Sequence, residues 1–254
     1  MKKRVPAIVA ALAIAGSMLL VTAGIATAVS SPSGGPAGTG PCATLVTTAK
    51  GPGATVAGIR AFANCEVNRR LATLSDLSAR VAASRAIAGS DATALAAEIA
   101  AENSGLTALK ARIDSETALL ALRADLVRVV TDYRVYVLVV PQVNLTIGSD
   151  VVRAAQAKFG QIGTALAARI ASAHAAGKDA TAAQSALDAM NASVAAAQAL
   201  VAPLPAKLLA LTPAQFNAGT AGPVLNAARA ALAHARDDLK AAAVDAKACL
   251  AALR

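Results

Sequence analysis

The stretch DYRVYVLVVPQVNLTIGSD, Asp132–Asp150, decides how the rest of the chain is interpreted. About a quarter of the protein is alanine, but this stretch has none, and both tyrosines of the chain lie in it close to Pro141. A two-residue β-hairpin turn at Pro141-Gln142 is excluded because its first position needs a positive φ, whereas proline holds φ near about −65°. The apolar run Val135–Val140 is also too short to span a membrane.

The residues before this proline fit a helix. Apolar residues alternate in steps of three and four, as in a coiled-coil seam, up to the residue before Pro141: Leu119, Leu122, Leu126, Val129, Tyr133, Tyr136 and Val140. Because proline disfavours the α conformation in the residue before it, this spacing predicts a helix over 91–140 that ends there. We expect a helical-hairpin tip near 138–142. Bulky side chains at this tip either fill the end of a bundle or form an interaction surface: Tyr133, Tyr136, Val137 and Pro141.

The next helix has two candidate starting points. Counting back by heptads from Phe159 and Val152 reaches Leu145, which favours a start near Gln142 and a tight hairpin. The alternative is a start at Ser149, which would cap the following turn after Gly148 breaks the chain. The spacing favours the earlier start, and we expect this helix over 142–176.

The remaining sequence is patterned in the same way. In the last segment the seam runs unbroken through nine positions in which leucine and alanine predominate: Leu225, Ala228, Leu232, Ala235, Leu239, Ala242, Ala246, Cys249 and Leu253. Further helices are expected over 55–88, 179–201 and 223–253, with Gly177 ending one helix and Asp179 capping the next. The sequence therefore predicts an all-α protein, an elongated antiparallel helical bundle or set of coiled-coil hairpins with about five helices over 55–254.

The N-terminus has the pattern of an export signal. Lys2, Lys3 and Arg4 precede a long apolar run, and Ala26-Thr27-Ala28 supplies the small residues that a signal peptidase accepts. We expect a signal peptide over 1–28, a flexible Gly/Ser/Pro-rich leader over 29–54, and an exported protein, extracellular or associated with the cell envelope. The alternative is that the apolar run stays attached as a membrane anchor, because its length approaches that of a spanning helix.

The charge indicates the classes of partner. The full chain carries a formal charge of +9, and removal of the three basic residues of the signal segment leaves about +6. A moderately basic surface favours an anionic cell-envelope polymer or lipid headgroups at a membrane surface, alongside an unidentified protein partner. Nucleic acid is not expected, because two tyrosines, three phenylalanines and no tryptophan offer few stacking platforms. The helix seams also allow oligomers.

The chain contains three cysteines, which permits at most one internal disulfide. If the first and last helices pack antiparallel, Cys65 and Cys249 fall at similar heights, so a Cys65–Cys249 bridge is the favoured pairing. The rival is Cys42–Cys65, which would join the leader to the first helix.

No motif indicates catalysis, a cofactor or a metal. The two histidines, His174 and His234, have no neighbouring residues arranged as in nucleophilic catalysis, and no HExxH, GxGxxG or phosphate-loop pattern is present. The cysteines do not have the spacing of a zinc site. We therefore expect a protein that is not an enzyme, although an unfamiliar active site stays open as a third hypothesis.

Several segments together resemble a group of uncharacterised exported, alanine-rich helical proteins from high-GC Gram-positive bacteria. They are LTALKARIDSETALLALRADLVRVVTDYRVYVLVVPQVNLTIGSD, GKDATAAQSALDAM and LLALTPAQFN, of which DYRVYVLVVPQ is the most specific. The resemblance covers most of the chain after Cys65 and implies export and helical architecture. It implies no activity and no functional residue. The favoured hypothesis is a non-catalytic helical-bundle protein with a structural or interaction role at the cell envelope; a membrane-associated protein is the alternative.

Overall fold

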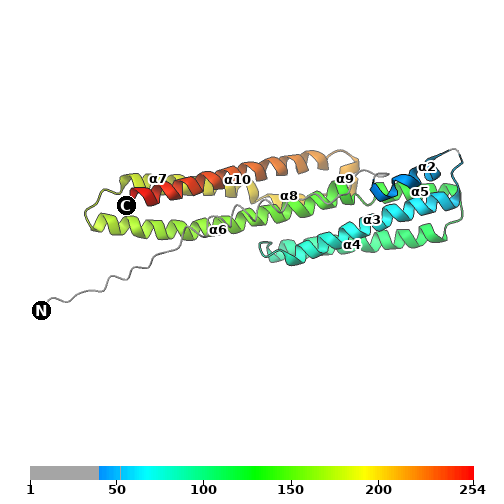
Figure 1. The fold of residues 1–254 in the computed structure, drawn as a ribbon, viewed down its shortest axis with the longest axis horizontal. Helices are drawn as coiled ribbons and strands as arrows, with labels where there is room; N and C mark the ends of the chain where they lie inside the picture. Colours follow the sequence, from blue (N-terminus) through cyan, green and yellow to red (C-terminus); the bar gives the residue numbers. More distant parts are fainter. Residues whose placement is uncertain (1–39, 52) are drawn as a thin grey trace.

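Every regular element in the described part of the chain is helical. The structure is a computed structural model, and it describes residues 40–51 and 53–254. The predicted signal peptide and most of the predicted leader lie outside the described residues. Figure 1 shows an elongated molecule in which two groups of helices lie end to end. The prediction of an all-α helical bundle is confirmed.

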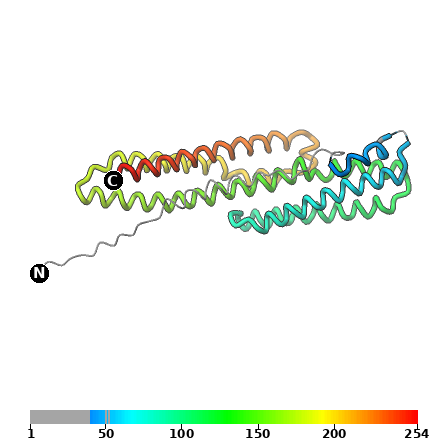
Figure 2. Tube along the Cα trace, in the orientation of Figure 1, coloured from blue at the N-terminus to red at the C-terminus, as the bar shows by residue number. Residues whose placement is uncertain are grey.

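One nearly continuous helical rod connects the two groups. It consists of α5 (Leu119–Thr131), the π-helical turn η3 (Val135–Val139) and α6 (Val140–Ala175). These elements follow one another in one direction along the length of the molecule (Figure 2). The rod comprises 57 residues, Leu119–Ala175, or about 85 Å at the rise of an α-helix. Its residues take part in both cores of the described chain.

The first bundle packs α3 (Val56–Ala83) and α4 (Gly89–Ser115) against α5. The short elements η2 (Gly40–Leu45) and α2 (Val46–Lys50) cover the N-terminal half of α3. Large side chains fill this core, as the apolar seams of the helices require: Ile59, Phe62, Leu74, Leu77, Leu95, Leu106, Ile113 and Leu122 are at most 2% exposed.

The second bundle packs α6, α7 (Thr181–Val201) and α10 (Ala221–Ala252), with α7 and α10 in the most extensive contact. Two short helices, α8 (Leu204–Leu209) and α9 (Pro213–Asn217), connect α7 to α10. Eight of the nine predicted seam positions of the last helix are buried, from Leu225 to Cys249. Leucine and alanine alternate at these positions from Leu225 to Ala242, and Ala246 and Cys249 follow; the small side chains allow the helix backbones to approach closely.

Local sequence explains several helix ends. The Thr55 hydroxyl accepts a hydrogen bond from the Gly58 amide at 3.1 Å and caps α3. Gly177, with φ of +72°, follows the end of α6 in the left-handed conformation that glycine tolerates. The Asp179 carboxylate then accepts from the Thr181 amide at 2.9 Å, at the start of α7. Thr212 and Gln215 form a reciprocal capping box on α9.

The prediction of a single helix over 91–140 is wrong. The chain reverses at Glu116–Ala118, so α4 and α5 form an antiparallel pair. Glu116 stabilises the reversal, because its carboxylate accepts hydrogen bonds from the Thr117 and Ala118 amides at 2.8 and 2.7 Å. The spacing of apolar residues in steps of three and four continues across this turn. A count of apolar seam positions ignores the polar residues that form the turn, so it did not predict the reversal.

The predicted hairpin tip near 138–142 is also wrong. Pro141 is the second residue of α6, where a missing N–H breaks no intrahelical hydrogen bond. Before it, the amides of Val139 and Val140 bond to the carbonyls of Arg134 and Val135, five residues back. The π turn thus lets a new helix start in nearly the same direction. This start at Val140 lies close to the earlier of the two predicted starts, Gln142, and not at Ser149.

The unusual composition of Asp132–Asp150 now has a physical reason. Successive faces of this segment pack into different cores: Leu138 and Leu145 into the second bundle, and Val139, Val143 and Ile147 into the first. A helix covered on both sides needs apolar residues around most of its circumference. We call this segment, Val135–Asp150, the joint.

Candidate functional site

A disulfide joins Cys42 of η2 to Cys65 of α3, and Cys249 is a buried free thiol. The predicted Cys65–Cys249 bridge is therefore wrong, and the rival pairing is the one present. The prediction required α3 and α10 to lie side by side, but they belong to opposite bundles (Figure 1). Periodicity along each helix carries no information on which helices are neighbours.

An ion cluster is buried beside the disulfide. Glu66, fully buried, accepts a hydrogen bond from Arg70 at 2.6 Å, and Arg69 lies 3.7 Å from the same carboxylate. Arg70 is also only 3% exposed. One buried and one partly buried arginine around one carboxylate are tolerated because the geometry is close and further polar contacts accompany it.

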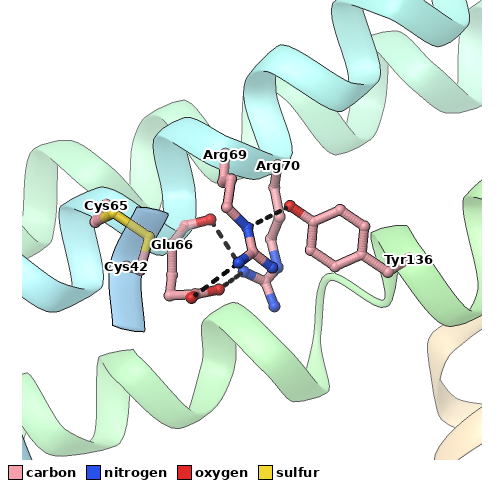
Figure 3. The surroundings of a disulfide bond; sticks show 6 residues. All are labelled: Cys42, Cys65, Glu66, Arg69, Arg70 and Tyr136. Carbon is pink, nitrogen blue, oxygen red and sulfur yellow. Dashed lines mark hydrogen bonds and ion pairs between the residues drawn. A yellow bond between two sulfur atoms is a disulfide. The ribbon is translucent and has the colours of Figure 1, made fainter. Parts of the chain in front are cut away.

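Tyr136 connects this cluster to the joint. Figure 3 shows its hydroxyl next to Arg69, whose Nε donates a hydrogen bond of 3.0 Å to it. The Arg69 and Arg70 guanidinium carbons lie 5.0 and 5.1 Å from the ring centroid, within the range of cation–π attraction. The disulfide, the ion cluster and Tyr136 thus hold α3, η2 and the joint in one arrangement.

A second polar cluster fixes the other end of the α3–α4 hairpin to the rod. Arg153 of α6 bridges Asp91 of α4, at 2.7 Å, and Asp150. Asp150 is almost fully buried and also accepts from the Ala88 amide at 3.0 Å. The bond from the Ala88 amide to Asp150 satisfies a free amide at the start of α4. A side chain of another helix thus serves as the cap of α4.

Between these fixed points, two carboxyl groups of α4 face the joint. Burial, with a smaller contribution from the neighbouring Glu102, raises the pKa of Glu98 from 4.5 to about 7, although a hydrogen bond with Gln142 opposes the shift. Burial likewise raises the pKa of Glu102 to about 7. Gln142 is fully buried, and its amide nitrogen donates to the Leu208 and Leu211 carbonyls at 2.9 and 3.1 Å. We call Glu98, Glu102 and Gln142 the carboxyl clasp.

The four residues predicted as an interaction tip lie in the middle of the molecule. Tyr136 belongs to the ion cluster, and Tyr133 packs its hydroxyl end on Gly105 of α4, where a Cβ would lie 2.6 Å from the oxygen. Pro141 is half-buried, and Val137 is 43% exposed. The four side chains therefore do not form one exposed surface.

The remaining candidates do not converge. His174 and His234 are exposed, one on α6 and the other on α10. Among the described residues, no group of three or more His, Cys, Asp or Glu side chains is arranged to hold a metal ion. An open groove follows the outer face of the α3–α4 pair and is lined mainly by small residues, such as Ser75, Ser78 and Ala100.

Within residues 40–51 and 53–254, two helical segments are long and apolar enough to cross a membrane by length and composition. They are Leu119–Ala175, whose most apolar window is 67% buried, and Thr181–Leu209, whose window is 28% buried. The first is the rod, and its apolar character follows from its position between two cores. The second owes its mean hydropathy largely to the alanines of α7.

Sequence reasoning missed the carboxyl clasp. Nothing in the sequence analysis singles out Glu98 and Glu102, because charged residues on a helix usually belong to a solvated face. A signal was available: no basic residue stands between Asp91 and Glu102, so neither carboxylate has an intrahelical partner one turn before it.

Comparison of the chain with protein-family models, curated proteins and solved structures yields no match.

Proposed function

We propose that this chain is an exported helical rod that acts without catalysis, in a structural or interaction role at the cell envelope. The observation that carries the proposal is the end-to-end arrangement of two bundles on one shared helix (Figures 1 and 2). A rod of about 85 Å holds two surfaces at a fixed separation, which is what a spacer or scaffold requires. Elongation also exposes long helix faces to partners.

The disulfide supports the compartment in this proposal. Cys42 and Cys65 are both withdrawn from solvent and joined, and disulfides persist in oxidising compartments outside the cytosol. The apolar N-terminal segment with its Ala26-Thr27-Ala28 cleavage pattern supports the same compartment independently. The basic balance of the chain suits anionic polymers or lipid headgroups of the envelope.

Fractionation of the native host tests the location. We expect the chain in the envelope or culture medium, starting at Val29, with a disulfide-linked Cys42–Cys65 peptide pair on non-reducing peptide mapping. A cytosolic protein with three reduced cysteines would contradict the proposal. An envelope protein that retains residues 1–28 would instead support the anchored alternative.

Solution scattering and cross-linking test the role. We expect a maximum dimension well above that of a sphere of equal mass, and cross-links of the exported chain to envelope components along the exposed faces of α7 and α10. A matched variant, Cys42→Ser/Cys65→Ser, should keep the second bundle and its cross-links. A compact particle, or cross-links confined to the α3–α4 groove together with turnover of a small molecule, would favour an enzyme.

A further inference from the structure

The contact between α4 and the joint contains acceptors in excess of donors. Glu102 Oε2 and Gln142 Oε1 are both buried without a hydrogen-bond partner, and the Gln142 amide nitrogen is already committed to two carbonyls near α8. None of the ion pairs among the described residues involves Glu98 or Glu102. Buried acceptors without donors are costly, and a carboxyl proton is the simplest donor that could serve them.

We propose that the carboxyl clasp is a proton-dependent latch that holds the middle of α4 against the joint when its carboxyl groups are protonated and releases it when both are ionised. A protonated carboxyl donates to the partner carboxylate or to Gln142 Oε1. When both protons are lost, the two carboxylates and the Gln142 amide oxygen have only the Gln142 amide nitrogen as a donor, and this nitrogen already bonds two carbonyls, so repulsion and desolvation oppose the contact. The inference goes beyond the proposed function and does not depend on it.

The surroundings of the clasp confine the opening to a short segment. On one side, Arg112 of α4 is paired with Asp125 of α5, and on the other Arg153 is paired with Asp91. The released segment is therefore the part of α4 between them, from about Leu95 to Gly105.

The charged and titratable groups around the clasp come from each element that packs on it. Tyr133, between α5 and η3, is the closest; burial raises the pKa of its hydroxyl, and the Glu102 charge adds to this effect. The arginines near Tyr133, Arg112 and Arg128, already pair with Asp125 and Asp132. On α8, Lys207 is exposed, and α6 contributes Gln142 and, two turns further on, the Asp150–Arg153 pair.

The direction of the pH effect follows from the raised pKa values of Glu98 and Glu102. A carboxyl group whose pKa is higher in the folded than in the unfolded chain binds more protons when folded. Its contribution to stability is complete below about pH 4.5 and is lost as the pH rises through about 7. Acidification therefore closes the latch, and mild alkalinity opens it.

Hydrogen exchange on the full chain at pH 5.5 and 8.0 tests the latch. After correction for intrinsic rates, amides from Leu95 to Gly105 should exchange on the order of tenfold faster at the higher pH, while α7 and α10 should not change. In Glu98→Gln/Glu102→Gln, which carries neutral side chains of the same size, the difference should disappear. The control Asp76→Asn/Asp188→Asn removes two charges from exposed sites and should keep it.

Two outcomes would overturn the proposal. One is equal protection of Leu95–Gly105 at both pH values in the wild-type chain. The other is a pH response that persists in Glu98→Gln/Glu102→Gln and vanishes in His174→Gln/His234→Gln, since histidine titrates in the same range.

A spectroscopic measurement keeps the test decisive if the double variant does not fold. The chain has two tyrosines and no tryptophan, so Tyr136→Phe leaves Tyr133, beside Glu102, as the only emitter. Its emission should change with a midpoint near pH 7. Emission that stays flat between pH 6 and 8 would rule the latch out.

Discussion

The two bundles are both built on one rod, but they are held together differently. The first has a core of large side chains, a disulfide and a buried ion cluster. The second combines large side chains with many buried alanines, and its one cysteine is unpaired. The first bundle gains stability from apolar area and covalent closure, and the second from close approach of helices over a long interface.

This difference predicts opposite sensitivities. A core of large side chains is damaged most by removing atoms, since a cavity remains. The second core also contains large side chains, but its alanine positions have few atoms to remove, so these positions are damaged most by adding atoms. Each of the four predictions below tests one side of this comparison.

Phe62→Ala should have the largest effect. Phe62 is 2% exposed in the first core, and such a truncation costs about 3–5 kcal/mol of unfolding free energy. Phe216→Ala, at a half-buried ring that Arg134 approaches to 5.4 Å, is the matched control and should cost less than half as much. Urea denaturation monitored by circular dichroism measures both. Equal losses for the two variants would mean that burial does not distinguish these sites.

Loss of the disulfide should come next. Cys42 and Cys65 are separated by 23 positions, and closing a loop of that size contributes about 3 kcal/mol on the chain-entropy model. Cys42→Ser/Cys65→Ser in a Cys249→Ala background is compared with Cys249→Ala alone. Hydrogen exchange should show the loss in η2, α2 and α3, with α7 and α10 unchanged. Loss of protection spread evenly over both bundles would contradict the separation between them.

The sequence predicted the second bundle more accurately than the first, for a physical reason. The seam from Leu225 to Cys249 is set by local periodicity, and Gly177 and Asp179 act within a few residues of their own position. The helical state of α6, α7 and α10 and most of their ends can therefore be predicted from short stretches, or windows, of the sequence. These windows are what sequence patterns describe.

The joint and the disulfide depend on which elements are neighbours, and short windows do not contain that information. An apolar run before Pro141 is compatible with two structures: a helix that ends in a hairpin, and a helix that is covered by two cores. The reversal was marked only by the polar residues around Glu116. The raised pKa values of Glu98 and Glu102 arise from burial, and Gln142, which bonds Glu98, lies about 40 residues away in the sequence. Within α4, the absence of a basic residue between Asp91 and Glu102 hints at this but does not identify the partner segment.

Ala242→Leu tests the other side of the comparison. Ala242 is fully buried in the second core, so a larger side chain should cost about 1–3 kcal/mol of unfolding free energy through overpacking. Ala241→Leu, one residue earlier on the exposed face of α10, is the matched control and should change stability by less than about 0.5 kcal/mol. Thermal and urea unfolding of the pair measure the difference. If Ala242→Leu is stabilising, the alanine layers are loosely packed and the comparison fails.

The smallest effect separates the two faces of α6 within the second bundle. A Cβ on Gly160 would contact nothing within 4 Å, so Gly160→Ala should stabilise the helix by about 0.5–1 kcal/mol by reducing the freedom of the unfolded chain. On Gly163 the same Cβ would lie 3.2 Å from Met190 Cε and 3.3 Å from Asn191 Oδ1 of α7. Gly163→Ala reduces the freedom of the unfolded chain equally, but the Met190 and Asn191 side chains must give way, so we expect it to be less stable than Gly160→Ala by about 1 kcal/mol. Urea midpoints of the two variants decide the matter, because equal stabilisation would mean that α6 and α7 do not depend on glycine for their close approach.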